Sequence, residues 1–192
     1  EGIKVNGEME LEFRITRSGK PYGDNVLAQV HAHRAIGLPV RLENIYSPYY
    51  TGGGEGALTD GFLGSMDFRD GHWQALQEND MAATIDLGEM KNVRSMSSRF
   101  YFYNNAWIFL PEEVSYYYSI DGVDWKLLES VAHEHPIQSE DQAIIPFATA
   151  KHEAKARYIR MKAKNIGFTP HWHDAPNEPA WLFCDEFVVL AD

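Results

Sequence analysis

The stretch Met81-Ala82-Ala83-Thr84-Ile85-Asp86-Leu87-Gly88 places an apolar side chain at every second residue. Because side chains of a strand point alternately to its two faces, this period of two predicts a β-strand with one buried face. No segment of the chain has a long apolar period of 3.6 residues. Several short strands separated by turn residues favour a sandwich or a barrel, so we predict an all-β fold. The same alternation recurs at Val114, Tyr116, Tyr118 and Ile120, and at Ile159, Met161 and Ala163.

Size and charge limit the classes of partner. The 192 residues suffice for one domain with a small appendage. The net charge of −11 repels nucleic acid phosphates and anionic lipid headgroups, so we expect no nucleic acid partner. No run of about 18 apolar residues occurs, so we expect no membrane insertion. The single cysteine, Cys184, excludes an internal disulfide, and its apolar neighbours indicate a buried thiol.

The segment Ile36-Gly37-Leu38-Pro39 interrupts the strand pattern and sets the expected domain boundary. Residues 1–36 resemble a hairpin too small to fold alone, so we expect the end of a truncated preceding β domain. Residues 37–192 form the expected main domain. The chain begins at Glu1 without a signal peptide, which we interpret as a piece excised from a longer protein.

Several motifs, taken in order, resemble the discoidin domain, the type C domain of coagulation factors V and VIII. The resemblance covers about residues 40–190 and implies a jelly-roll β-sandwich that binds carbohydrate without catalysis. The motifs are Ala57-Leu58-Thr59-Asp60-Gly61, Trp73, Ala83-Thr84-Ile85-Asp86-Leu87-Gly88, Tyr118-Ser119-Ile120-Asp121-Gly122-Val123-Asp124-Trp125, Ala156-Arg157-Tyr158-Ile159-Arg160-Met161 and Asp185-Glu186-Phe187.

Other phrases are similar to the discoidin-like modules at the C-terminus of bacterial β-N-acetylhexosaminidases of the chitobiase type. This resemblance implies an attached catalytic domain, an extracytoplasmic location in a bacterium, and a glycan that contains N-acetylhexosamine or galactose. It also identifies residues 1–36 with the last strands of a chitobiase C-terminal type domain. The phrases are Gly19-Lys20-Pro21-Tyr22-Gly23, Tyr46-Ser47-Pro48, Trp107-Ile108-Phe109-Leu110-Pro111 and Trp181-Leu182-Phe183-Cys184-Asp185-Glu186.

The adjacent acidic pair Asp185 and Glu186 invites comparison with the carboxyl pair of a glycoside hydrolase. Two neighbours on a strand point to opposite faces, whereas hydrolysis needs both groups across one bond. No nucleophile-elbow, phosphate-loop or dinucleotide motif occurs either, so we predict that this chain is not an enzyme. Two alternatives to sugar binding stay open. One is a spacer that braces a catalytic domain, and the other is a membrane or protein adhesion domain of discoidin type.

The resemblance also implies a structural Ca²⁺ between the first loop and the last strand. The family loop carries a second acidic residue where this chain has Phe62 and a threonine where it has Ser65. The implied side-chain ligands are Asp60, Ser65 and Glu186, and the implied carbonyl ligands are Ala57, Phe62 and Cys184. A hard cation accepts carboxylate and carbonyl oxygens together. The alternative is that Asp60 only shapes a turn.

Two His-x-His pairs occur in the chain. We interpret His31 and His33 as imidazoles on a strand surface, because no third zinc ligand is evident. The second pair, in His171-Trp172-His173, lies in a loop rich in proline and aspartate. An exposed ring flanked by imidazoles suits a sugar, although Trp172 could instead cover the edge of the core. We add Tyr103, Asn105 and His72 as further sugar-binding candidates, and expect Trp73 and Trp107 in the core.

Overall fold

A computed structural model describes residues 7–192. Regular structure is almost entirely β, as the alternation predicts, and the two helices among the described residues are short 3-10 turns. Neither of them is long and apolar enough to cross a membrane. The turns are η1 (Ala57–Thr59) and η2 (Asn104–Ala106), and the strands are β1 (Glu8–Phe13), β2 (Thr16–Arg17), β3 (Lys20–Pro21), β4 (Val26–His31), β5 (Val40–Leu42), β6 (Phe62–Leu63), β7 (Gln74–Gln77), β8 (Met81–Phe102), β9 (Glu113–Ser119), β10 (Lys126–Ala132), β11 (Ala143–Ala148), β12 (Ala154–Ala163) and β13 (Trp181–Ala191).

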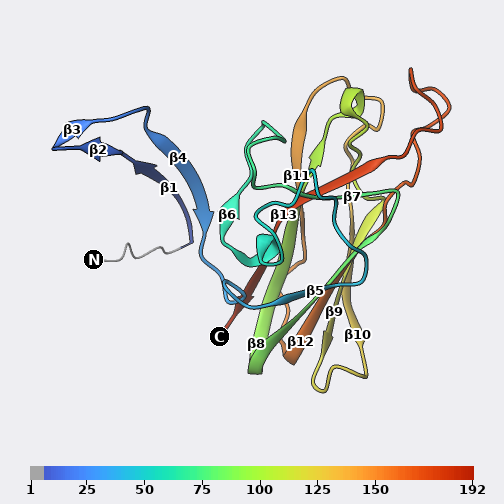
Figure 1. The fold of residues 1–192 in the computed structure, drawn as a ribbon. Helices are drawn as coiled ribbons and strands as arrows, with labels where there is room; N and C mark the ends of the chain where they lie inside the picture. The colour runs from blue at the N-terminus through green and yellow to red at the C-terminus, as the bar shows by residue number, and fades with distance from the viewer. Residues whose placement is uncertain (1–6) are drawn as a thin grey trace.

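The long strand β8 joins the two layers of a sandwich (Figure 1). Its first part pairs with β12 and β5, where Ile159 and Val40 both face Ile85 in register. Its last part pairs with β11 and β13, where Phe147 and Phe187 both face Ser98. The order β10-β9-β12-β8-β13-β7 therefore passes from one layer to the other through β8. The prediction of an all-β sandwich is confirmed.

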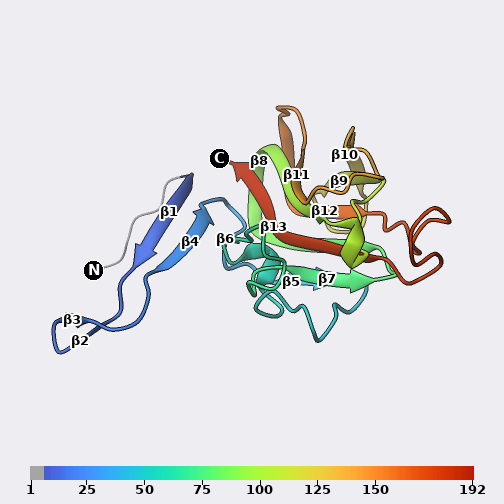
Figure 2. The same ribbon diagram turned by 90° about the horizontal axis from the view of Figure 1, so that it is seen from above.

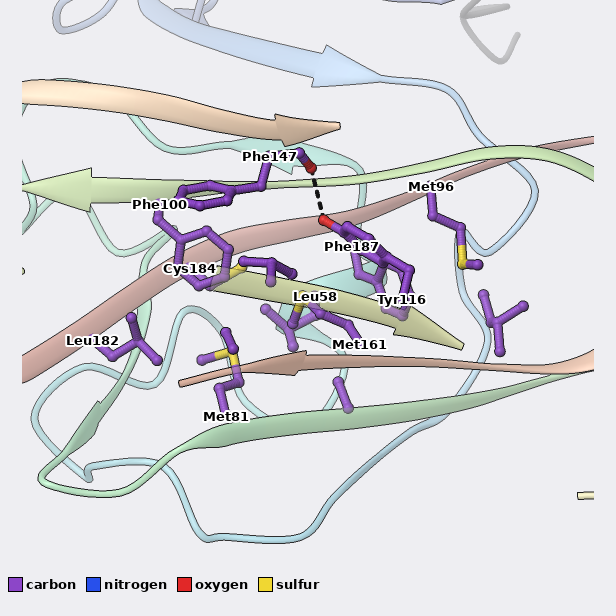
Figure 3. Packing of buried hydrophobic residues seen from close by; sticks show 14 of the residues in the cluster. Leu58, Met81, Met96, Phe100, Tyr116, Phe147, Met161, Leu182, Cys184 and Phe187 are labelled. Carbon is purple, nitrogen blue, oxygen red and sulfur yellow. Dashed lines mark hydrogen bonds between the residues drawn. The ribbon is translucent and has the colours of Figure 1, made fainter. Parts of the chain in front are cut away.

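The core lies between the two layers and contains the side chains that the alternation predicted to be buried (Figure 3). The hydroxyl of Tyr116 donates to the carbonyl of Phe147 over 2.7 Å, and burial raises the pKa of this phenol far above its usual range. The thiol of Cys184 is completely buried among apolar side chains, as expected. From β8, Met81, Ala83 and Ile85 are fully buried.

A second, smaller core lies under the loops and contains Trp73, which is 1% exposed, as expected from the sequence. The Trp73 ring lies edge-on to Tyr101 at 5.1 Å between centroids. Gly64 passes directly beneath the indole, and a Cβ built there would be 2.3 Å from Cε2 of Trp73. Glycine is therefore required at residue 64 by close approach, since any side chain would displace the ring.

The N-terminal hairpin of β1 and β4 projects away from the sandwich (Figure 2). It is joined to the rest of the molecule by β6, which pairs Val30 with Phe62. Beyond β4 the chain runs along the sandwich, where the N–H of Arg34 donates to the carbonyl of Val189 over 2.9 Å. Residues 30–37 thus lie against the sandwich, whereas the far part of the hairpin stands clear of it.

Candidate functional site

Loops from three parts of the chain enclose a polar hollow of about 770 Å³. They are the turn after β8, the connection between β10 and β11, and the long connection between β12 and β13. We call this space the polar hollow. It is lined by Asn104, Asn105, Trp107, Gln138, Glu140, Trp172, His173, Asp174 and Ala175.

Hydrogen bonds fix the walls of the polar hollow. Nδ1 of His173 accepts from the N–H of Ala175 at 3.0 Å, so the ring carries its proton on Nε2. That Nε2 lies 2.9 Å from the carbonyl oxygen of Asn104 and donates to it. The amide of Asn104 in turn donates to the carbonyl of Ser139 over 2.8 Å. The three loops therefore hold one another, and the hollow is largely formed before any ligand arrives.

The side-chain oxygen of Asn104 is a buried polar atom beside this region. Oδ1 is buried, and no donor among the described residues reaches it. A buried acceptor without a protein partner costs free energy unless water or a ligand supplies a donor.

Trp107 stands between the polar hollow and a neighbouring aromatic one. Its φ is +62°, a left-handed conformation that is costly for a bulky residue. Backbone hydrogen bonds impose it, because the Trp107 N–H donates to Asn104 and its carbonyl accepts from Trp181, both at 2.8 Å. The expectation that Trp107 belongs to the core is wrong, since its half-buried ring packs in neither core cluster.

On the other side of Trp107 lies a second space, which we call the aromatic hollow. Its larger part measures about 530 Å³, and a smaller part of about 250 Å³ extends it to Trp107. Arg69 covers the Phe68 ring at 4.7 Å, and Tyr49 is 85% exposed at the rim. The lining residues are Tyr49, Tyr50, Thr51, Gly52, Phe68, Arg69, Gly71, Trp73 and Trp181 in the larger part, with Ala106, Trp107, Ile108 and Phe183 in the smaller.

Three of the six sugar-binding residues predicted from the sequence line the polar hollow: Asn105, Trp172 and His173. Asn105 is exposed at the rim. Trp172 combines the two alternatives left open, because its ring lines the hollow and also packs against the main core.

The other three predicted residues lie outside both hollows. Tyr103 is half-buried and packs into the small aromatic core. His72 stacks on Phe62 at 5.5 Å between ring centroids, and His171 is exposed on its loop. The aromatic hollow was not predicted. Its only sequence signals are the turn-rich stretch 46–54 and the Phe68-Arg69 pair in a loop bounded by aspartates.

The predicted calcium ligands centre on Glu186, whose side chain is fully buried on β13. Burial, the neighbouring Asp60 and the adjacent Asp185 raise the pKa of Glu186 to about 10. Nε2 of His33 lies 2.7 Å from Oε1 of Glu186. The other carboxyl oxygen of Glu186, Oε2, accepts from the backbone N–H of Gly61 at 3.0 Å. Asp60 is half-buried, and its Oδ1 accepts from the N–H of Phe62 at 2.8 Å.

The remaining predicted calcium ligands lie on the first loop, η1, β6 and β13. Ser65 is exposed, its carbonyl accepts from the indole N–H of Trp73 at 3.0 Å, and its N–H donates to Asp70. Phe62 lies in β6, Ala57 in the buried turn η1, and Cys184 on β13. Within residues 7–192, no group of three or more histidine, cysteine, aspartate or glutamate side chains is arranged to hold a metal ion.

His33 departs from its predicted place. We expected it on a strand surface, but its side chain is completely buried against Glu186. Burial, with a smaller contribution from His31, lowers the pKa of His33 to about 4, so the ring is neutral at pH 7. His31 lies on β4, the strand on whose surface it was expected, and is half-exposed, with Nδ1 3.8 Å from Oε1 of Glu8. The prediction fails for His33 because it lies just beyond β4, where the chain turns onto the sandwich.

The fold and its loops define a class of protein, a β-sandwich of jelly-roll type whose loops enclose open hollows of ligand size. The comparison with protein families makes the assignment definite. The model of the F5/8 type C domain matches residues 44–183, and the chain belongs to this family. A comparison with curated proteins gave no match.

The chain is similar to several solved structures of low sequence identity. A mutant of chitosan-binding module 1, from a chitosanase/glucanase of Paenibacillus sp. IK-5, has a TM-score of 0.50 and 12% identity, over 83% of this chain and 98% of that one. CBM32-3 from a family 31 glycoside hydrolase of Clostridium perfringens has a TM-score of 0.49 and 14% identity, over 81% and 90%. The C-terminal domain of a Bacteroides fragilis chitobiase has a TM-score of 0.43 and 12% identity, over 80% and 94%.

Proposed function

We propose that this chain is a non-catalytic carbohydrate-binding module and that the sugar binds in the polar hollow against Trp107. The observation that carries the proposal is the composition of this hollow, which combines two indole rings with amides and carboxylates. A pyranose has an apolar face and a rim of hydroxyls, so its binding site needs a flat ring beside several polar partners. The family membership of the chain supports the same class of function.

Each kind of side chain in the polar hollow has a role in this proposal. The carboxylates of Glu140 and Asp174 accept hydrogen bonds from sugar hydroxyls, and the amides of Asn105 and Gln138 can both donate and accept. Bonds to charged acceptors are about twice as strong as neutral ones and fix the orientation of the ring. The Trp107 indole offers its face to the sugar, because the backbone holds the ring away from both cores.

The aromatic hollow extends the proposal from a single sugar to an oligosaccharide. It adjoins the polar hollow across Trp107, which lines both spaces. Tyr49 and Arg69 at its rim provide a second stacking ring and a second set of donors. A chain of two or more sugars laid across Trp107 would therefore contact both spaces, and the longer ligand should bind more tightly than the monosaccharide.

The acidic pair supports a module without catalysis. Asp185 and Glu186 are both fully buried, and Asp185 pairs with Arg99 while Glu186 pairs with His33. Neither carboxyl group lines the polar hollow or the aromatic hollow. Binding alone would still serve an attached enzyme, because tethering raises its effective concentration at the glycan.

For the parent protein we propose a bacterial glycoside hydrolase of the β-N-acetylhexosaminidase type, acting outside the cytoplasm on glycans with N-acetylhexosamine or galactose. Residues 1–36 would then be the last strands of a preceding β domain. The described part of this segment supports the idea, since Phe13 and Val26 oppose each other on one face of the hairpin. They are 42% and 51% exposed, and such an apolar face is normally covered.

Titration calorimetry with N-acetylglucosamine, its dimer and galactose tests the function. If Trp107 supplies the stacking face, Trp107→Ala should weaken binding about tenfold, since stacking contributes on the order of 1 kcal/mol beyond area and ~1.4 kcal/mol is one decade. Trp125→Ala is the matched control, because Trp125 is also half-buried but lines neither hollow. Its ring lies under the guanidinium of Arg160, with Cζ 4.0 Å from the ring centroid. Absence of binding to any of these sugars would favour the spacer alternative instead.

A further inference from the structure

The F5/8 type C family implies a structural calcium ion between the first loop and the last strand, and the donor chemistry at Glu186 does not fit one. A hard cation is held by six to eight oxygen lone pairs directed at it. Besides the neighbouring side chain of Asp60, the protein directs an N–H group at each of the two carboxyl oxygens of Glu186. Nε2 of His33 lies 2.7 Å from Oε1, and the N–H of Gly61 lies 3.0 Å from Oε2.

The position of the proton on His33 follows from its second ring nitrogen. Nδ1 accepts from the N–H of Ala35 at 3.2 Å, and the N–H of Val189 approaches it at 3.4 Å. An imidazole whose Nδ1 accepts hydrogen bonds carries its proton on Nε2. His33 is therefore a donor to Glu186, and its N–H occupies the direction that a cation would need.

The other implied ligands do not restore a cation site. Phe62 carries no acidic group, Oδ1 of Asp60 accepts from the Phe62 N–H, and Oγ of Ser65 accepts from the N–H of Asp67 at 3.2 Å. The side chains of His33 and Glu186 are both 0% exposed, so neither can turn to a solvent ion without opening the sandwich. The contact spans 153 residues of sequence and joins the N-terminal segment to the last strand.

We propose that His33 and the Gly61 amide take the place of the calcium ion in this module, so that its fold needs no metal. Glu186 on β13 then joins two other parts of the chain, the segment after β4 through His33 and the first loop through Gly61, and His33 is a bracing residue of this arrangement. The proposal concerns the frame of the sandwich and does not depend on sugar binding.

The first test needs no variant. The chain is melted after treatment with a chelator, and again with calcium chloride added back in excess. We expect the two melting temperatures to agree, because a ligand stabilises a fold only if it binds the folded state. A melting temperature that rises with calcium concentration would overturn the proposal.

The second test removes the imidazole. His33→Ala leaves a fully buried carboxyl group without one of its two donors, so the melting temperature should fall by roughly 5–15 °C. His33→Gln should recover part of that loss, since its amide can donate to Glu186. His31→Ala is the control, because this half-exposed neighbour shares the segment and should shift melting by less than ~2 °C. If His33→Ala melts like the parent chain, His33 is not a brace.

Discussion

Replacing Gly64 by alanine should damage the fold through a single contact. The added Cβ would lie 2.3 Å from Cε2 and 2.4 Å from Nε1 of Trp73, well inside any real contact distance. Relief by moving the backbone is restricted, because the Gly64 N–H donates to Asp185 at 2.9 Å and its carbonyl accepts from Arg99 at 2.7 Å. The indole must therefore move, which also breaks its 3.0 Å bond to Ser65.

The expected cost follows from these two losses. Overpacking of a well-packed site costs ~1–3 kcal/mol, and leaving the indole N–H without its partner adds about 1–2 kcal/mol. The sum of roughly 2–5 kcal/mol lowers the melting temperature by about 4–20 °C at ~2–4 °C per kcal/mol for a chain of this size. Because residues 64–73 carry Phe68 and Arg69, the same change should weaken oligosaccharide binding.

Thermal and urea unfolding of Gly64→Ala measure this cost. Gly56→Ala is the control, because a Cβ at Gly56 meets nothing within 4 Å. In the Gly64→Ala background, Trp73→Phe should recover stability, since the smaller ring leaves room for the methyl group. Equal stability of Gly64→Ala and Gly56→Ala would refute the argument. A double variant that loses more stability than Gly64→Ala and Trp73→Phe lose together would also refute it.

Two further changes test the core and the surface by urea unfolding. Tyr116→Phe leaves the buried Phe147 carbonyl without its 2.7 Å donor and should cost about 1–2 kcal/mol of unfolding free energy; an unchanged midpoint would show that the bond adds nothing. Hydrogen bonds from Arg157 hold the pKa of Asp86 at about 2, below its ordinary 3.8. The pair therefore makes its full contribution to the free energy of unfolding above pH ~4. This contribution, under ~1 kcal/mol for an exposed pair, is lost as the pH falls toward 2. Arg157→Gln should remove this pH-dependent contribution to stability. If the variant keeps the same dependence on pH, the Asp86–Arg157 pair is not its cause.

The sequence predicted the sandwich because its strands obey a local rule. A strand with one buried face must place an apolar residue at every second position, and Met81, Ala83 and Ile85 do so and are fully buried. Trp107 shows the limit of the rule. It begins an apolar run that predicts burial, but one residue of left-handed backbone turns its ring away from both cores.

The site was harder to predict because it depends on contacts between distant loops. Trp172 and His173 were found from their composition within one short loop, and they do line the polar hollow. Tyr50 and Trp181 lie far apart in the chain, yet their rings meet at 5.4 Å in the aromatic hollow. The contact of His33 with Glu186 likewise joins residues near the two ends of the chain, and no local sequence pattern predicts it.

The central claim is that a sugar binds against Trp107 at the loop end of the sandwich. Crystals of the chain soaked with N-acetylglucosamine, and separately with galactose, test it most directly. We expect one of the two sugars in the polar hollow, with its apolar face on the Trp107 ring and its hydroxyls within hydrogen-bond distance of Asn105, Glu140 or Asp174. A sugar found only at a place remote from Trp107, or hollows that stay free of sugar in both soaks, would contradict the account.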